Sequence, residues 1–287
     1  MHPKTILSLT GAASLVAIPT ARAHHGQDFL VALDADVPDP WHATVFSSFE
    51  WSKRGDEDEL SIEPGFMAGI GPGLALGTSV RFAEEESSGW DYSSVDPTLQ
   101  WKIPTGDFPV SFALSAGYVF AEESGHSHGS AGHHHHEEEE EGGVDPGPDG
   151  PGPGGEEHEH DHGQEHDHGS HSHGGIHRHG EDHFHLRFIA DTRLGEQTRL
   201  VVNLIGVAPG SGEYDFGYAI GLRHQFTHAW AAGVENIGDF NVHGENEVIA
   251  GLYWTPVHAC TIRLGAGAGI GQASSDFSLR SGVTWRF

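Results

Sequence analysis

Apolar and polar residues alternate along most of this chain, and the alternation is clearest over residues 277–287. The apolar side chains of that stretch share one face of an extended chain: Phe277, Leu279, Val283, Trp285 and Phe287. Serine, threonine and arginine side chains occupy positions between them. Because successive side chains of a β-strand point to opposite faces, the pattern predicts a strand with one apolar and one polar face.

Similar two-residue periods recur along the chain, which predicts twelve strands in all. We expect them at residues 43–53, 60–70, 74–83, 97–103, 110–120, 184–193, 199–207, 214–226, 229–236, 248–255, 260–270 and 277–287. Those at 97–103, 229–236 and 248–255 are short for a strand that crosses a bilayer. The predicted fold class is all-β, a 12-stranded antiparallel up-and-down β-barrel over residues 41–287.

Short and long connections alternate along the chain, depending on whether the preceding predicted strand is even-numbered or odd-numbered. Those after even-numbered segments are tight, at 71–73, 104–107, 195–197, 227–228 and 256–258. Those after odd-numbered segments are mostly longer and more polar, at 54–59, 84–96, 121–183, 208–213, 237–247 and 271–275. A soluble β-sandwich has little reason to sort its loops in this way, whereas transmembrane barrels have short turns at one end and long loops at the other.

The first 23 residues have the three parts of an export signal. Lys4 supplies a positive charge, residues 5–17 are mostly apolar, and Ala21-Arg22-Ala23 fits a cleavage site. We therefore expect residues 1–23 to be a signal peptide and residues 24–40 to form a periplasmic N-terminal segment or a plug. Cys260 is the only cysteine, so no intrachain disulfide can form.

The signal sequence, the loop asymmetry and the terminal Phe287 resemble those of Gram-negative outer-membrane β-barrel proteins. The resemblance implies a transmembrane barrel in the bacterial outer membrane, with apolar side chains against lipid and polar ones in the lumen. The even number of strands agrees with both termini lying in the periplasm. The sequence leaves the oligomeric state open.

The alternation predicts which charged side chains face the lumen. They are Glu50, Glu63, Arg81, Lys102, Arg187, Asp191, Arg193, Asp215, Arg223, Glu235, Arg263, Arg280 and Arg286. One hypothesis is a network of paired charges that fills and stiffens the interior. The other is a polar permeation path with a selective field. Inward Gly, Ala and Ser residues leave room for a narrow pore, unless residues 24–39 fold in as a plug.

An insert of 63 residues, 121–183, separates the fifth and sixth predicted strands and has a composition unlike the rest. It is rich in His, Asp, Glu and Gly, carries 17 acidic residues against one basic residue, and predicts a disordered extracellular loop. With its exit it holds 17 of the 25 histidines: His126, His128, His133, His134, His135, His136, His158, His160, His162, His166, His168, His171, His173, His177, His179, His183 and His185.

Neutral imidazole is a good ligand for Zn, Cu and Ni, and neighbouring carboxylates concentrate divalent cations and complete their coordination. The insert resembles the histidine-rich loops of zinc transporters and zinc-binding periplasmic receptors. The resemblance implies several loosely held Zn, Cu or Ni ions and no tightly bound cofactor. The alternative is a solvated acidic tract that binds no physiological metal.

The chain carries 14 basic and 42 acidic residues, which argues against a nucleic-acid partner and favours cations. Short matches to G-x-S-x-G at 125–129, G-x-G-x-x-G at 150–155 and H-E-x-x-H at 158–162 all fall inside the insert, where no strand or helix is predicted to support them. No P-loop motif occurs, so we expect no enzyme. The main functional hypothesis is a barrel, surrounded by outer-membrane lipid, that captures divalent transition-metal cations for uptake or surface buffering. The alternatives are a porin-like channel for small solutes and a closed structural or adhesion barrel.

Overall fold

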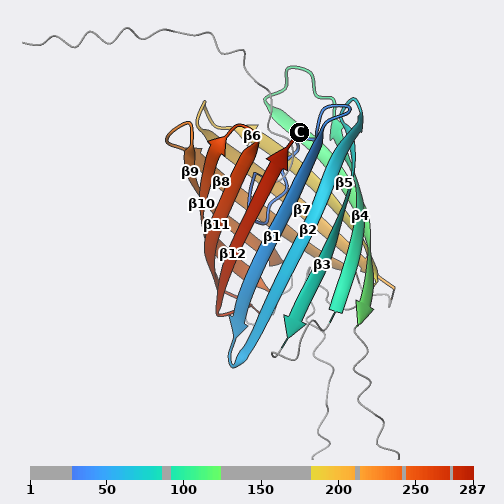
Figure 1. Cartoon of the computed structure of the whole chain (residues 1–287), viewed down its shortest axis with the longest axis vertical. Helices are drawn as coiled ribbons and strands as arrows, with labels where there is room; N and C mark the ends of the chain where they lie inside the picture. The colour runs from blue at the N-terminus through green and yellow to red at the C-terminus, as the bar shows by residue number, and fades with distance from the viewer. Residues whose placement is uncertain (1–27, 86–91, 124–181, 211–213, 241–243, 272–273) are drawn as a thin grey trace, which may run out of the picture.

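A computed structural model of the chain describes residues 28–85, 92–123, 182–210, 214–240, 244–271 and 274–287. Twelve antiparallel strands form one closed barrel, in which each strand pairs with its sequence neighbours and β1 pairs with β12 (Figure 1). This confirms the predicted 12-stranded barrel. The strands are β1 Ala43–Arg54, β2 Glu57–Gly71, β3 Leu74–Glu85, β4 Tyr92–Ile103, β5 Val110–Glu123, β6 His183–Arg193, β7 Thr198–Pro209, β8 Asp215–Gln225, β9 Trp230–Asp239, β10 Asn246–Val257, β11 Cys260–Gly269 and β12 Phe277–Arg286.

The N-terminal 27 residues, where the signal peptide is predicted, lie outside the described residues, and so do residues 124–181 of the predicted long loop. Within the described part of the chain, no helix is long and apolar enough to cross a membrane.

The three segments that look short in the sequence are longer strands, since β4 has 12 residues, β9 has 10 and β10 has 12. The predicted fourth strand begins only at Pro97, a residue type that cannot donate to a ladder. In the barrel, β4 starts at Tyr92 and pairs with β3 through Pro97, while its ladder with β5 passes from Val95 to Thr98. A proline is therefore accommodated inside this strand where the ladder on one side is interrupted.

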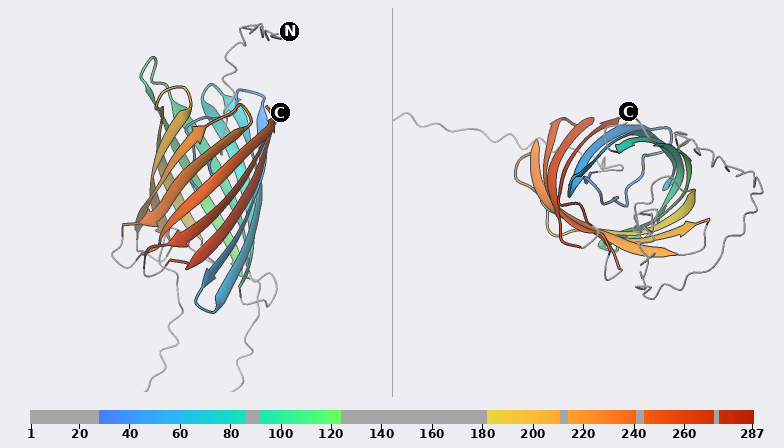
Figure 2. Two further views of the ribbon diagram at one scale, coloured as in Figure 1. Left: turned by 90° about the vertical axis from the view of Figure 1, so that its left-hand side faces the viewer. Right: turned by 90° about the horizontal axis from the view of Figure 1, so that it is seen from below.

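The two ends of the barrel differ (Figures 1 and 2). The terminal end carries the start of β1, the end of β12 and the connections after even-numbered strands, and the loop end carries the connections after odd-numbered strands. The predicted loop at 54–59 is wrong, because Gly55 and Asp56 alone join β1 to β2 and Arg54 pairs with Glu57. Gly55 has a φ of 61°, which suits the first central position of a type II′ hairpin.

Side chains alternate between an apolar outer face and a small or polar inner face. On β8 the outward residues Phe216, Ile220 and Leu222 are exposed, whereas the inward Gly217, Ala219 and Gly221 are buried. Every strand exposes at least one large apolar side chain on the outside. An exposed apolar surface of this extent around the whole cylinder is the surface that a bilayer covers.

Residues 28–40, which we call the lumen segment, precede β1 and lie inside the barrel (Figure 2, right). Phe29, Ala32 and Ala35 are buried in one apolar cluster with inward side chains of the strands, among them Ile205 and Ile249. The buried core of this protein is thus the contact between the lumen segment and the inner wall.

Small residues on the wall make room for the lumen segment. A Cβ atom added at Gly221 on β8 would lie 2.6 Å from the ring of Phe29. One added at Gly251 on β10 would lie 3.1 Å from a methyl group of Leu30. Glycine at these inward positions therefore permits a close approach that a larger residue would prevent.

Candidate functional site

The backbone of the lumen segment is held by wall side chains, and Glu235 on β9 is central to this attachment. Its carboxylate accepts hydrogen bonds from the backbone N–H groups of Leu30 at 2.6 Å, Val31 at 2.9 Å and Ala32 at 3.0 Å. The hydroxyl of Tyr253 on β10 donates a fourth hydrogen bond to it at 2.6 Å. Because Glu235 is 1% exposed, its charge is offset by these donors and by nearby arginines rather than by bulk water.

A second group of wall side chains holds the next part of the segment. Asn203 on β7 accepts from the backbone N–H of Leu33 at 2.7 Å and donates to its carbonyl at 2.8 Å. Gln100 on β4 donates to the carbonyls of Asp34 at 3.0 Å and Asp36 at 3.2 Å. Buried backbone groups must be paired, and here side chains do what a neighbouring strand does in a sheet.

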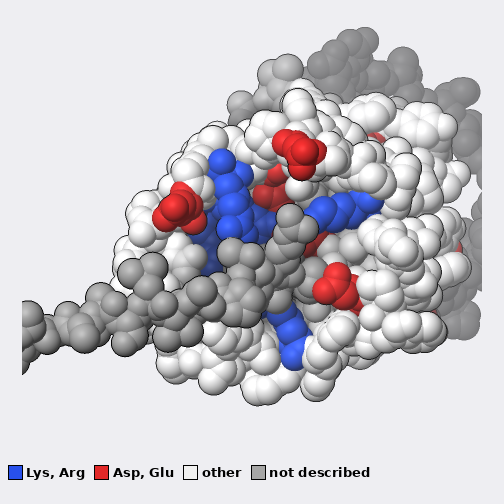
Figure 3. Space-filling model, turned by 90° about the horizontal axis from the view of Figure 1, so that it is seen from above, with Lys and Arg blue, Asp and Glu red and all other residues white. Residues whose placement is uncertain are grey.

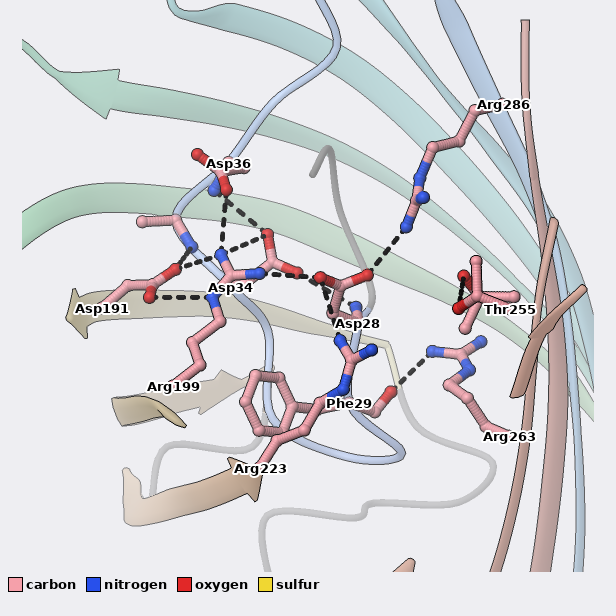
Figure 4. A network of polar contacts seen from close by, with 12 residues as sticks. Asp28, Phe29, Asp34, Asp36, Asp191, Arg199, Arg223, Thr255, Arg263 and Arg286 are labelled. Carbon is pink, nitrogen blue, oxygen red and sulfur yellow. Dashed lines mark hydrogen bonds and ion pairs between the residues drawn. The ribbon is translucent and has the colours of Figure 1, made fainter. Parts of the chain in front are cut away.

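Arg199 on β7 joins the acidic residues of the segment to the wall (Figure 4). Its guanidinium lies 2.8 Å from a carboxylate oxygen of Asp28, 2.9 Å from Asp36 and 2.5 Å from Asp191 on β6. Asp34 is 3.7 Å away and fully buried, and this burial raises the pKa of its carboxyl to about 7. Networks of this kind fix geometry because removing one partner leaves the others buried and unpaired.

Asp34, Asp36 and Asp191 are the only described residues that bring three potential metal-ligand atoms together, within 4.8 Å of one another. The cation among them is the guanidinium of Arg199, which forms ion pairs with all three carboxylates. The chemistry of the cluster is therefore that of an ion-pair network.

Further basic side chains bind the segment close to the terminal end. Arg223 on β8 and Arg286 on β12 form ion pairs with Asp28 at 3.2 and 2.7 Å. Lys102 on β4 forms an ion pair with Asp36 at 2.5 Å, and Arg263 on β11 donates to the carbonyl of Phe29 at 2.5 Å. Viewed from this end, Lys and Arg side chains gather around the mouth of the barrel (Figure 3).

A cavity of about 300 Å³ lies on the loop side of the lumen segment. The backbone and side chains of residues 29–33 form part of its lining, and inward side chains of the strands form its wall. The wall carries both signs of charge, from Glu50, Glu63, Arg81, Asp96, Arg187, Arg263 and Arg280. The lining of the cavity thus combines charged and apolar side chains, and the lumen segment closes it toward the terminal end.

The thirteen predicted lumen charges fall into separate groups. Contacts with the lumen segment or its network involve Lys102, Arg187, Asp191, Arg223, Glu235, Arg263 and Arg286. Arg81 forms an ion pair with Glu59 at 3.1 Å, and Arg280 pairs with Glu50 at 2.5 Å and with Glu247 at 2.7 Å. Glu63 and Arg187 line the cavity. Arg193 is exposed at the end of β6, where it lines a small pocket with Asp28, Arg199 and Arg223, and Asp215 is half-buried at the start of β8.

Fifteen of the seventeen predicted metal ligands lie outside the described residues, between 124 and 181. The other two, His183 and His185 on β6, line the cavity with their ring centres 6.4 Å apart. His185 Nε2 lies 2.9 Å from a carboxylate oxygen of Asp96 on β4. Neither histidine belongs to a three-ligand group among the residues that the structure describes.

The sequence interpretation missed Arg199, Asn203 and the acidic residues of the lumen segment. Arg199 and Asn203 share a face of β7 with Val201, which is fully buried, and with other apolar residues that resemble a lipid-facing set. A signal was nevertheless present, because the predicted lumen charges comprise eight basic and five acidic residues. Asp28 and Asp36 form ion pairs with three of those basic residues, Lys102, Arg223 and Arg286.

No protein-family model and no curated protein matches the sequence. Among solved structures, the KdgM porin is similar with a TM-score of 0.50 and 8% identity, over 85% of this chain and 99% of that chain. The COG4313 outer membrane channel from Pseudomonas putida F1 is similar with a TM-score of 0.51 and 8% identity, over 88% of this chain and 98% of that chain. A structure of the KdgM porin in complex with disordered oligogalacturonate gives 0.51 and 7% identity, with 85% and 99% covered. At these identities the likeness is one of fold, and that fold is a bacterial outer-membrane β-barrel.

Proposed function

We propose that this protein is a porin-like outer-membrane channel for small polar solutes, in which the lumen segment closes the passage. The observation that carries the proposal is the non-covalent attachment of residues 28–40 inside an otherwise continuous barrel. A purely structural barrel could fill its interior with strand side chains alone, whereas this wall keeps glycines facing a separate segment. The likeness to porins and channels supports the same function.

The orientation follows from the general rule for outer-membrane barrels, whose termini and short turns face the periplasm. In that orientation the cavity opens to the outside and the lumen segment separates it from the periplasm. A solute would enter the cavity first and pass when the segment leaves its contacts with Glu235, Asn203 and Arg199. The released segment and the wall then form hydrogen bonds with water in place of those contacts, so the net cost of release is small and the segment can return.

Planar-bilayer recording of the mature protein tests the proposal. We expect a variant that lacks residues 28–40 to conduct persistently and the wild-type chain to conduct rarely or in brief openings. A folded deletion variant that shows no conductance would refute the channel function. Liposome swelling with neutral sugars then reports whether uncharged solutes pass, and a variant without residues 124–181 reports whether that segment matters for them.

A second candidate function, capture of divalent transition-metal cations, is favoured by His183 and His185. They lie on the cavity wall where residues 124–181 join β6, so an ion bound by that segment would meet two imidazoles on entering. Acidification to about pH 5 should release the metal, because protonated imidazole cannot bind it.

Calorimetric titration of the mature protein with Zn²⁺ and Cu²⁺ tests metal capture. We expect binding tighter than about millimolar, which is about 4 kcal/mol, and its loss when residues 124–181 are removed. The double variant His183→Gln/His185→Gln should weaken binding, while His224→Gln/His228→Gln at the terminal end serves as the control. Equal binding by the full chain and the shortened chain would contradict this function.

A further inference from the structure

Two opposite charges on the cavity wall, Arg187 and Glu63, attract one another electrostatically, but no direct ion pair joins them in the described part of the chain. The guanidinium of Arg187 on β6 reaches only neutral oxygens, the side-chain oxygen of Asn203 at 3.3 Å and the carbonyl of Val31 at 3.5 Å. Glu63 on β2 lines the same cavity, and no hydrogen bond or ion pair joins it to another described residue. Both side chains are only half-buried, so a solute in the cavity can reach them.

The other charges of this wall are engaged. Arg280 is paired with Glu50, and Arg81 is paired with Glu59. Asp96 accepts from the hydroxyl of Thr98 at 3.1 Å and lies 2.9 Å from the ring of His185. Arg187 and Glu63 are therefore the opposite charges of this cavity between which a ligand can be placed, and the carboxylate of Asp96 adds a second negative charge that acts on Arg187.

We propose that the cavity binds a small zwitterionic solute, a free amino acid, with its carboxylate on Arg187 and its ammonium group on Glu63. A planar guanidinium suits a carboxylate, which it can bind through two parallel hydrogen bonds. The two residues stand on walls separated by β3, β4 and β5, so one ligand with separated charges can face both. The volume of about 300 Å³ is at the lower end of small-molecule pockets, which suits a ligand of this size.

The mixed charge excludes simpler ligands. A small anion attracted to Arg187 would be repelled by Glu63 and Asp96, and a small cation attracted to Glu63 would be repelled by Arg187. A zwitterion satisfies both signs at once and leaves no new charge unpaired. This proposal names the solute class for the proposed channel, but the binding itself requires no conductance.

Calorimetric titration of the mature protein in detergent tests the site, with L-glutamine as the zwitterionic probe. Two analogues remove one charge each: N-acetyl-L-glutamine lacks the ammonium group, and L-glutamine α-amide lacks the carboxylate. We expect each analogue to bind at least about tenfold more weakly than L-glutamine, since each loses one charge-assisted contact. Equal binding of the three probes, or no binding of L-glutamine at about 10 mM, would overturn the proposal.

Two variants make the test specific. Glu63→Gln should remove the preference for the ammonium group, so that N-acetyl-L-glutamine binds about as well as L-glutamine. Arg187→Gln should remove the preference for the carboxylate, so that the α-amide binds about as well. These changes are relative affinities measured on one protein sample, so loss of folded protein cannot produce them. If Arg187→Gln does not fold, Glu63→Gln alone decides, and an unchanged preference for the ammonium group overturns the assignment.

The outcome is independent of the channel proposal. If the mature protein binds L-glutamine selectively but the variant lacking residues 28–40 does not conduct, the site is retained and the channel is refuted. Conductance without selective binding would retain the channel and refute the site.

Discussion

Replacing Glu235 by Gln removes a single charge from the attachment of the lumen segment. In the wild-type chain the carboxylate accepts four hydrogen bonds, three from backbone N–H groups of residues 30–32 and one from Tyr253. An amide of nearly the same shape has only one acceptor oxygen, and its NH₂ group would face donors. The substitution therefore changes the hydrogen bonds while leaving the packing volume almost constant.

The expected effect is large. At least two of the four donors lose their acceptor, and a hydrogen bond to a charged group contributes about 1.5–3 kcal/mol. The segment itself loses one or two of these bonds, so its attachment should weaken by about 1.5–6 kcal/mol, which corresponds to a factor of roughly 10 to 10⁴ in the ratio of released to attached segment. The barrel strands themselves lose only the Tyr253 contact, so the barrel should remain folded.

Single-channel recording measures this ratio as the fraction of time spent open. Glu235→Gln should open far more often than the wild-type chain and approach the behaviour of the deletion of residues 28–40. Glu196→Gln is the matched control, because Glu196 lies in an exposed turn at the terminal end. If the Glu235 variant opened no more often than wild type while the deletion variant conducted freely, the carboxylate would not be what holds the segment.

Three further predictions follow from the same contacts. Burial raises the pKa of Asp34 from 3.8 to about 7, so the attached segment binds this proton more tightly than the released segment does. Attachment should therefore weaken, and the open time should rise, as the pH increases from about 4 to about 7. Asp34→Asn should make the open time less dependent on pH over this range. Gly221→Ala places a Cβ 2.6 Å from the ring of Phe29, and this overpacking should destabilise the attached segment by ~1–3 kcal/mol and increase the open time. Gly206→Ala is the control, because its nearest contact would be at 3.6 Å, and it should leave the open time unchanged. Leu264→Arg puts a charge on the outer face in the middle of β11, which should lower the free energy of unfolding in a bilayer by ~2–4 kcal/mol. An unchanged urea unfolding midpoint in phospholipid vesicles would contradict the lipid-facing assignment.

The strand pattern was predictable because a barrel wall imposes one local rule on every strand. Lipid outside and polar groups inside enforce a period of two, and that period is visible without knowledge of the partner strands. The errors arose where local signals mislead. The fourth strand was predicted to begin at Pro97, whereas β4 begins at Tyr92. The polar residues 54–59 suggested a loop where Gly55 and Asp56 alone make a hairpin.

The interior was less predictable, because it depends on a segment that has no periodicity of its own. Residues 28–40 form no strand, so nothing local indicates that wall side chains satisfy their backbone. Arg199 escaped notice for a related reason, since its β7 neighbours Val201 and Ile205 are apolar yet face inward to cover the segment. Only the excess of inward positive charge pointed to an acidic partner, and charge balance is a property of the whole wall rather than of any one stretch.

The seam between β1 and β12 joins residues that are more than 220 positions apart along the chain, with Lys53 opposite Phe277 and Thr44 opposite Arg286. Residues 28–40 are made before any strand, yet they end up enclosed by all twelve. The wall therefore encloses a piece of the chain that is synthesised before it. The carboxylates at positions 28, 34 and 36 meet arginines and a lysine from widely separated strands, so they can recruit those strands around themselves as a template for the cylinder.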